Sequence, residues 1–278
     1  MNIFNTEKME MKAYCYLQIE INGSVAILWL NRPEKHNALN PVMMQEVIHF
    51  FETIEGDDSV RVVLIKGRGK SFCAGADLQW LYNSSDLTSE DNLDEARLLS
   101  AFFATVFHSS KVTVGVAHGN VFGGGNGLLA ACDLAYAIDN SCFSLSETRI
   151  GMIAASISPY MLQKLSVLVY KELVFTARRF DAIEAVQMGL LNASFETVKE
   201  MNEHIQLVIR LLLEAGPHAL AGSKRLINNL LDPGEASMAI KEIPELLAAV
   251  RVSNEAREGF SAFLEKRKPD WIMKIKEG

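Results

Sequence analysis

Two stretches decide the fold of this chain: Ser71-Phe72-Cys73-Ala74-Gly75-Ala76-Asp77-Leu78 and Gly119-Asn120-Val121-Phe122-Gly123-Gly124-Gly125-Asn126-Gly127. In each, an apolar run typical of a buried strand gives way to small residues and then to a helical pattern. Side chains do not shield the backbone N–H groups at such a junction, and the start of a helix adds positive potential. Two such junctions could stabilise one oxyanion, so the acid or base beside it would decide the reaction.

The triplet Gly123-Gly124-Gly125 has other interpretations when it is taken alone. It lacks the Lys-Ser/Thr ending of a phosphate-binding P-loop and the spacing of a dinucleotide fingerprint. Three glycines can also do no more than permit a tight turn. Only the pairing with Ala74-Gly75-Ala76-Asp77 favours an oxyanion site.

The pattern along the chain predicts an α/β fold of stacked β-β-α turns. Residues 16–21 and 25–30 alternate around Asn22-Gly23, which predicts a hairpin. Strand, strand and helix then recur, which favours stacked β-β-α turns over a doubly wound sheet. Further strands are expected at 61–66, 112–117 and 134–138, and helices from Pro41 onward, at 89–109 and at 128–132. From about Ser156 we expect only helices, at 158–168, 170–176, 181–188, 200–215, 218–231, 243–250 and 254–266.

Composition limits the classes of protein that this chain can represent. A chain of 278 residues with 49% hydrophobic residues predicts one main domain with a helical appendage, and no apolar run is long enough to span a bilayer. The predicted parts are a short extension at 1–14, a core at 15–200 and a helical region at 201–278. Residues 1–14 resemble no secretory signal or transit peptide. The net charge of −7, with one basic cluster at 266–268, argues against a nucleic-acid partner.

The four cysteines indicate a reducing compartment. Cys15, Cys73, Cys132 and Cys142 lie in apolar segments without metal-type spacing, so we expect free, buried thiols. The chain is therefore predicted to be cytoplasmic, with neither a membrane nor a metal partner.

Glu147 is the acid that the sequence singles out. It lies among small and apolar residues, where the predicted strands give way to helices. Partial desolvation there would raise the pKa of its carboxyl group and suit proton transfer near neutral pH. The alternative is an exposed glutamate or an ion pair with Arg149.

Over residues 16–271 the chain resembles the crotonase (enoyl-CoA hydratase/isomerase) superfamily. The matching motifs are Asn31-Arg32-Pro33-Glu34-Lys35-His36-Asn37-Ala38-Leu39, Phe72 to Leu78, Gly119 to Gly127 followed by Ala130-Ala131-Cys132-Asp133, and Glu258-Gly259-Phe260-Ser261-Ala262-Phe263. The resemblance implies a ClpP-like spiral of β-β-α turns with a C-terminal helical trimerisation region. It also implies a homotrimer or homohexamer, and a coenzyme A thioester as substrate with no further cofactor.

The same resemblance implies roles for individual residues. The backbone N–H groups of Ala74 and Gly124 would form the oxyanion hole, and Glu147 would be the acid/base. The positions that match coenzyme A contacts are Lys35, Ala38, Ala74, Gly75, Ala76, Asp77 and Gly124, together with Phe263 and Lys266 on a helix that reaches a neighbouring subunit in many members.

One position departs from the pattern of typical hydratases, which carry two glutamates. The second matches Glu147, but Gly127 stands in place of the first, so the pair that would clamp a water molecule is incomplete. A single glutamate can still hydrate a double bond if another group orients the water. It can also serve a double-bond isomerase, which needs one base.

The sequence around Glu147 looks like that of methylglutaconyl-CoA and isohexenylglutaconyl-CoA hydratases. Such a substrate has a distal carboxylate, and the candidates to surround the acyl group or orient water are Trp80, Gly127, Arg149, Ser156, Ser158 and Tyr160. We therefore predict a lyase that hydrates a 2-enoyl-CoA, as in leucine degradation. The rivals are an enoyl-CoA isomerase and a weakly catalytic homologue that only binds CoA esters.

Overall fold

Strands β1 (Leu17–Asn22) and β2 (Val25–Leu30) form the predicted antiparallel hairpin, with Asn22 paired to Val25. They belong to a computed structural model that describes residues 14–273. The predicted extension at 1–14 lies outside the described residues except for Tyr14. Parallel strands β3 (Val62–Gly67), β4 (Val112–Ala117), β6 (Leu134–Ile138) and β9 (Ala193–Phe195) complete a six-stranded sheet in the order β1-β2-β3-β4-β6-β9.

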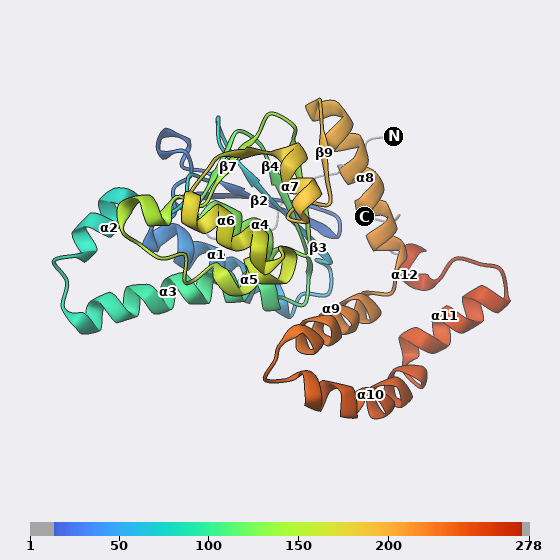
Figure 1. Ribbon diagram of the computed structural model, residues 1–278. Helices are drawn as coiled ribbons and strands as arrows, with labels where there is room; N and C mark the ends of the chain where they lie inside the picture. Colours follow the sequence, from blue (N-terminus) through green and yellow to red (C-terminus); the bar gives the residue numbers. More distant parts are fainter. Residues whose placement is uncertain (1–13, 274–278) are drawn as a thin grey trace.

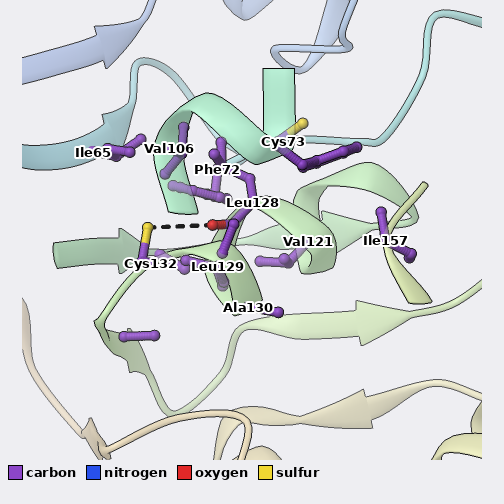
Figure 2. Packing of buried hydrophobic residues seen from close by; sticks show 14 of the residues in the cluster. Ile65, Phe72, Cys73, Val106, Val121, Leu128, Leu129, Ala130, Cys132 and Ile157 are labelled. Carbon is purple, nitrogen blue, oxygen red and sulfur yellow. Dashed lines mark hydrogen bonds between the residues drawn. The ribbon is translucent and has the colours of Figure 1, made fainter. Parts of the chain in front are cut away.

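This sheet separates two apolar layers. Alternate residues of a strand point to opposite faces, so Val63 and Ile65 of β3 join one layer while Val62 and Leu64 join the other. Helices α1 (Pro41–Glu55), α3 (Ser89–His108) and α4 (Gly124–Ala131) cover the first face, and α8 (Val198–Glu214) covers the second. Figure 2 shows the core around α4. The strands have almost continuously apolar sequences because both faces of the sheet are buried.

A second, smaller sheet produces the spiral. It has the order β5-β7-β8, formed by β5 (Asn120–Phe122), β7 (Cys142–Ser144) and β8 (Phe180–Asp181). The chain passes from β4 to β5 and into α4, and then repeats the step from β6 to β7 and the 3₁₀ helix η2 (Glu147–Ile150). The predicted α/β fold with recurring strand, strand and helix is therefore confirmed.

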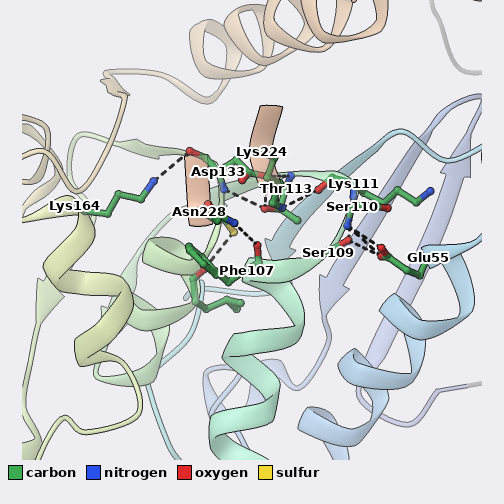
Figure 3. Close-up of polar contacts among 12 residues, drawn as sticks. Glu55, Phe107, Ser109, Ser110, Lys111, Thr113, Asp133, Lys164, Lys224 and Asn228 are labelled. Carbon is green, nitrogen blue, oxygen red and sulfur yellow. Dashed lines mark hydrogen bonds and ion pairs between the residues drawn. The ribbon is translucent and has the colours of Figure 1, made fainter. Parts of the chain in front are cut away.

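The C-terminal helices form an arm beside the spiral (Figure 1). It contains α9 (Pro217–Leu231), α10 (Ala236–Arg251) and α11 (Asn254–Leu264), and α12 (Asp270–Met273) returns to α8, where Trp271 Nε1 donates to the Glu214 carbonyl oxygen at 3.0 Å. Lys224 of α9 ties the arm to the spiral, with Nζ 2.9 Å from Asp133 Oδ2 and 3.0 Å from the Lys111 carbonyl oxygen (Figure 3). The predicted core boundary at residue 200 falls inside α8, which packs on the sheet.

Several predicted elements need correction. Strands do not stop at Ser156, because β8 and β9 follow. The two helices expected at 158–168 and 170–176 are present as α5 (Ser158–Lys164) and α6 (Val167–Thr176). The boundary between them lies earlier than predicted, because the Ser166 side chain accepts a hydrogen bond from Val169 N–H and caps α6. Helices α4 and α10 start earlier than predicted, at Gly124 and Ala236, and helix α2 (Leu78–Ser84) and strands β5 and β7 have no predicted counterpart. Helix α7 (Ala182–Met188) lies where a helix was expected at 181–188.

The cysteine prediction is wrong for Cys15, which is exposed, and Cys142 is half-buried. Cys73 and Cys132 are buried, and burial raises the pKa of each thiol to about 12. All four are free thiols. No helix among residues 14–273 combines the length and apolar character that a membrane crossing requires.

Candidate active site

The two junctions that the sequence singled out lie side by side. Cys73 and Val121 form a parallel bridge, in which Phe122 N–H donates to the Cys73 carbonyl oxygen at 3.0 Å and Cys73 N–H donates to that of Asn120 at 3.3 Å. The turns that follow these bonded residues are therefore held against each other. A Cβ built on Gly75 would lie 3.0 Å from the Phe122 carbonyl oxygen and 3.6 Å from Gly123 Cα.

Only glycine suits the tightest points of the two turns. Gly75 has φ = 90° and Gly123 has φ = 46°, both in the region that side chains with a Cβ rarely adopt. A Cβ on Gly123 would also come within 3.1 Å of Glu147 Oε1. The carboxylate of Glu147 therefore lies directly against the second turn.

The N–H groups at these turns correct one predicted role. Ala74 N–H donates to the His36 carbonyl oxygen at 3.0 Å, so it is not available to a ligand. Ala76 N–H and Gly124 N–H have no acceptor among the described residues, and both residues line one chamber. Gly124 is also the first residue of α4, where the helix dipole favours negative charge. The N–H groups free to bind an oxyanion are thus those of Ala76 and Gly124, and the predicted donor Ala74 is excluded by its bond to His36.

The motif from Asn31 to Leu39 supports the first turn. Asn37 is fully buried, has φ = 55°, accepts from Arg32 N–H at 2.8 Å, and donates to the carbonyl oxygens of Arg68 and Ser71, both at 2.8 Å. This brings the neighbouring His36 carbonyl to Ala74. The contribution of the motif is therefore to fix the backbone around the first junction.

Asp77 also has a structural task. Its carboxylate is 2.6 Å from Arg32 Nη1 and accepts hydrogen bonds from the N–H groups of Gln79 and Trp80 at the start of α2. Burial acts against ionisation, but the bonds from Arg32 and α2 outweigh it and lower the pKa of Asp77. The Asp77 carboxylate is therefore already bonded to Arg32 and to the N-terminus of α2.

Glu147 begins η2 and is half-buried. Its Oε2 is buried and has no hydrogen-bond partner among the described residues. Burial raises the pKa of this carboxyl group. No ion pair joins it to Arg149 among these residues, because the Arg149 guanidinium donates to the Thr176 carbonyl oxygen at 2.8 Å. The alternative of an ion-paired turn glutamate is therefore wrong.

A chamber of about 300 Å³ opens in front of these groups, and most of its lining is apolar. Ile150, Met152 and Ile153 are exposed at its edge. Of the predicted site residues, the chamber brings together Ala74, Gly75, Ala76, Gly124, Glu147, Arg149 and Ser156.

Other predicted acyl-site residues lie outside the lining. Ser158 Oγ donates to the Ala154 carbonyl oxygen at 2.6 Å and lies 2.8 Å from the Tyr170 hydroxyl group. Tyr160 packs on Phe107, with ring centroids 5.2 Å apart. Trp80 packs against the apolar core from α2. None of these three side chains lines the chamber.

The predicted coenzyme A contacts are scattered in one chain. Lys35 is exposed on the 3₁₀ helix η1 (Pro33–Lys35), and Ala38 is half-buried beside it. Phe263 is 83% exposed at the end of α11, and Lys266 follows on the surface. Figure 1 shows α11 on the arm, away from α2 and α4. Within one chain, therefore, Phe263 and Lys266 do not lie near the chamber.

Sequence reasoning missed Asn126. This residue is fully buried, and its Nδ2 donates to the carbonyl oxygens of Val121 and Ser144, both at 2.9 Å. It thereby joins β5, which leads to the second turn, to β7, which leads to Glu147. An Asn inside a Gly-rich helix start was the available signal, since buried amides are usually bonded to the backbone. No cluster of metal-ligating side chains occurs among the described residues.

A spiral fold with paired backbone donors beside one desolvated carboxylate defines a site that can stabilise a thioester enolate. Comparison with known proteins agrees with this. Residues 20–274 match the family model for enoyl-CoA hydratase/isomerase, and the chain belongs to this family.

Three relatives illustrate the range of the family. A Thermus thermophilus protein named as an enoyl-CoA hydratase is 34% identical, over 91% of this chain and 99% of its own. The crystal structure of an enoyl-CoA hydratase from Shewanella pealeana has a TM-score of 0.87 at 34% identity, covering 92% of this chain and 96% of its own. A peroxisomal Δ(3,5)-Δ(2,4)-dienoyl-CoA isomerase of Arabidopsis thaliana is 29% identical over 94% of this chain and 98% of its own.

Proposed function

We propose that this protein adds water across the double bond of a 2-enoyl-CoA thioester, with Glu147 as the single acid/base. The observation that carries the proposal is the carboxylate of Glu147, which has an unpaired, buried oxygen and lies against the turn at Gly123. The free N–H groups of Ala76 and Gly124 line the same chamber.

The reaction follows from these positions. The thioester oxygen accepts hydrogen bonds from Ala76 and Gly124, which draws electrons from C3. Glu147 takes a proton from water, the hydroxide oxygen bonds to C3, and an enolate forms. Glu147 then returns the proton to C2, so that water has been added and the glutamate is regenerated. Each oxyanion donor contributes about 3–4 kcal/mol to the stability of the transition state.

A hydroxyl group has to hold the water that a second glutamate would otherwise orient. Ser146 and Ser156 line the chamber, and their hydroxyl groups have no hydrogen-bond partner among the described residues. Ser156 is our candidate, because Ser158, the other serine suggested by the sequence, is bonded to Ala154 and Tyr170.

The finer substrate proposal is a branched glutaconyl-type thioester such as 3-methylglutaconyl-CoA. Its distal carboxylate needs a cation, and Arg149 is the only cationic side chain among the described residues that line the chamber. The one hydrogen bond from its guanidinium, to Thr176, leaves other donors available for a carboxylate.

An enoyl-CoA isomerase is the second candidate function. A single carboxylate that can carry a proton between C2 and C4 is sufficient for it, and the Arabidopsis relative bears an isomerase name. Isomerisation would need no bound water, and the mostly apolar lining would suit it.

The assembly proposed for this chain is a homotrimer or homohexamer in the cytoplasm. Phe260, Phe263 and Leu264 of α11 expose more than half of their surface, which favours burial against a neighbouring copy. In such an assembly Phe263 and Lys266 of one copy, with Lys35 of another, would contact coenzyme A. No metal, redox cofactor or nucleic acid takes part.

The proposal is tested with purified wild-type protein, Glu147→Gln, and the matched control Glu196→Gln at an exposed position. The substrates are crotonyl-, 3-enoyl-, 3-methylcrotonyl- and 3-methylglutaconyl-CoA in water and in deuterium oxide. We expect hydrated product from wild type and the control, and a loss of about 10²- to 10⁴-fold in kcat for Glu147→Gln.

Each rival gives a different result in this assay. Deuterium exchange without hydrated product would establish the isomerase. Full activity of Glu147→Gln would refute the mechanism, and binding without turnover by wild type would establish the weakly catalytic homologue. Equal rates on crotonyl- and 3-methylglutaconyl-CoA would refute the glutaconyl preference.

A further inference from the structure

The inner wall of the chamber is formed by Ile157 and Phe103. Ile157 immediately precedes α5 and is only 3% exposed, while Phe103 comes from α3 and is fully buried. Both side chains line the chamber. The wall therefore combines α3 with the segment that follows Glu147.

Ile157 packs directly on the backbone of α4. A Cβ built on Gly127 would lie 2.1 Å from Ile157 Cγ2 and 3.1 Å from Phe103 Cε1, so no side chain fits at position 127 unless Ile157 moves. Figure 2 shows Ile157 on the segment beside α4. The missing side chain at 127 and the bulky one at 157 are complementary.

The position of this contact relates it to the acyl chain. Gly124 and Gly127 are three residues apart in α4, so they lie on one face, about 4.5 Å apart along the axis. If the thioester oxygen binds to Gly124 N–H, the methyl groups of Ile157 lie about one helical turn away. In that position the acyl carbons from C3 onward would reach as far as the methyl groups of Ile157.

The polar side chains that line the chamber are Ser146, Glu147, Arg149 and Ser156, all from the segment that contains η2. The inner residues Leu99, Phe103 and Ile157 are apolar. We propose that Ile157 is a specificity-determining residue, which admits a short acyl group and excludes longer chains by closing the inner end of the chamber. This inference rests on the proposed function in one respect, that an acyl-CoA ester occupies the chamber.

Binding of saturated acyl-CoA esters tests this without turnover. Dissociation constants for butyryl-CoA and octanoyl-CoA are measured by calorimetry on wild type, Ile157→Ala and Ile157→Val. The matched control is Ile153→Ala, since Ile153 also lines the chamber but is 76% exposed. The ratio of the two constants cancels the part of binding that coenzyme A itself contributes.

We expect the ratio to shift at least tenfold toward octanoyl-CoA in Ile157→Ala, and in the same direction but less in Ile157→Val. If Ile157→Ala does not fold, the ratio measured on Ile157→Val tests the proposal in its place. Gly127→Ala should shift the ratio toward butyryl-CoA, because the added methyl group pushes Ile157 into the chamber. Ile153→Ala should keep it within twofold of wild type.

The proposal is overturned if Ile157→Ala weakens both esters equally, or if Ile153→Ala gives the same shift. Turnover of the enoyl-CoA panel by wild type separates a failure of the proposed role of Ile157 from a failure of the proposed reaction. Turnover with an unchanged ratio overturns only the role of Ile157, and a shifted ratio without turnover overturns only the proposed reaction. Failure of both esters to bind overturns both.

Discussion

The two walls that face each other across the chamber are built in different ways. The backbone wall consists of residues 74–76 and 122–124, and strand pairing between the preceding residues Cys73 and Val121 holds it. The side-chain wall consists of residues 146–157, and side-chain bonds to the end of α6 hold it, from Thr148 to the Val174 carbonyl oxygen and from Arg149 to that of Thr176, both at 2.8 Å. The first wall offers N–H groups, and the second offers a carboxylate and hydroxyl groups.

This difference separates the part of the site that would serve any thioester reaction from the part that would determine the reaction and the substrate. Backbone donors can stabilise an enolate for many thioester reactions, since they are indifferent to the rest of the substrate. The proton chemistry and the fit of the acyl group depend on Glu147, Arg149, Ser156 and Ile157, all from the side-chain wall. Changes in the backbone wall should therefore abolish activity, and changes in the side-chain wall should redirect or reduce it.

The sharpest test compares one glycine from each wall. Gly123→Ala should lower kcat by about 10²- to 10³-fold, because it strains the turn and displaces both the Gly124 donor and Glu147. Gly151→Ala is the matched control, since Gly151 also has positive φ, at 75°, but an added Cβ would meet nothing within 4 Å. Equal losses in the two variants would contradict the contrast between the walls.

Asn126 joins β5 to β7, the strands that lead into the two walls, and its loss should appear as lost stability. Asn126→Ala removes two buried hydrogen bonds, to the carbonyl oxygens of Val121 and Ser144, which should lower the free energy of unfolding by about 1–3 kcal/mol. Urea denaturation of Asn228→Ala provides the comparison, because that side chain makes one partly exposed bond of 3.3 Å to Phe107. If both variants lose the same stability, Asn126 has no special role.

A milder change loosens the side-chain wall alone. Thr148→Val removes the bond to Val174, worth about 1 kcal/mol, and should reduce kcat a few-fold while KM stays the same, because Glu147 is held less firmly. Thr53→Val removes a bond of the same kind, 2.8 Å to the His49 carbonyl oxygen on α1, and should leave kcat unchanged. A rise in KM without a change in kcat would show that Thr148 does not act through Glu147.

The smallest effect concerns pH and stability. Burial raises the folded pKa of Glu147 above the ordinary value of 4.5, so the folded state holds the proton more tightly than the unfolded state. The free energy of unfolding therefore falls as pH rises from about 4.5 through the folded pKa, and this loss persists above it. Relative to wild type, Glu147→Gln should gain stability at pH 8 and lose this advantage near pH 4. A constant difference between the two proteins across this range would show that Glu147 is not desolvated.

Much of the spiral could be predicted because its strands and glycine turns leave strong local signals. The runs at 112–117 and 119–127 indicate a strand followed by a turn, and the structure has β4, β5 and α4 there. The three residues of β7 and the two of β8 are too short for any periodicity to show. They form strands only because the spiral brings Phe143 opposite Phe180.

In the site, Glu147 could be found from its apolar surroundings, but the choice between Ala74 and Ala76 could not. It depends on the His36 carbonyl, which the bonds of Asn37 bring to Ala74 from another part of the chain. The contact of Ile157 with Gly127 is likewise invisible in sequence, because the two residues meet only through tertiary packing.

The bridge between Cys73 and Val121 has a consequence for how such a protein can evolve. It closes the intervening chain, including α2 and α3, into a loop whose two ends are held by backbone bonds. The entropy cost of closing a loop rises only slowly with its length. Insertions or deletions at 85–88, between these helices, can therefore remodel the chamber through Leu99 and Phe103 without shifting the oxyanion donors. New substrate ranges are thus open to changes in loop length as well as to point substitutions.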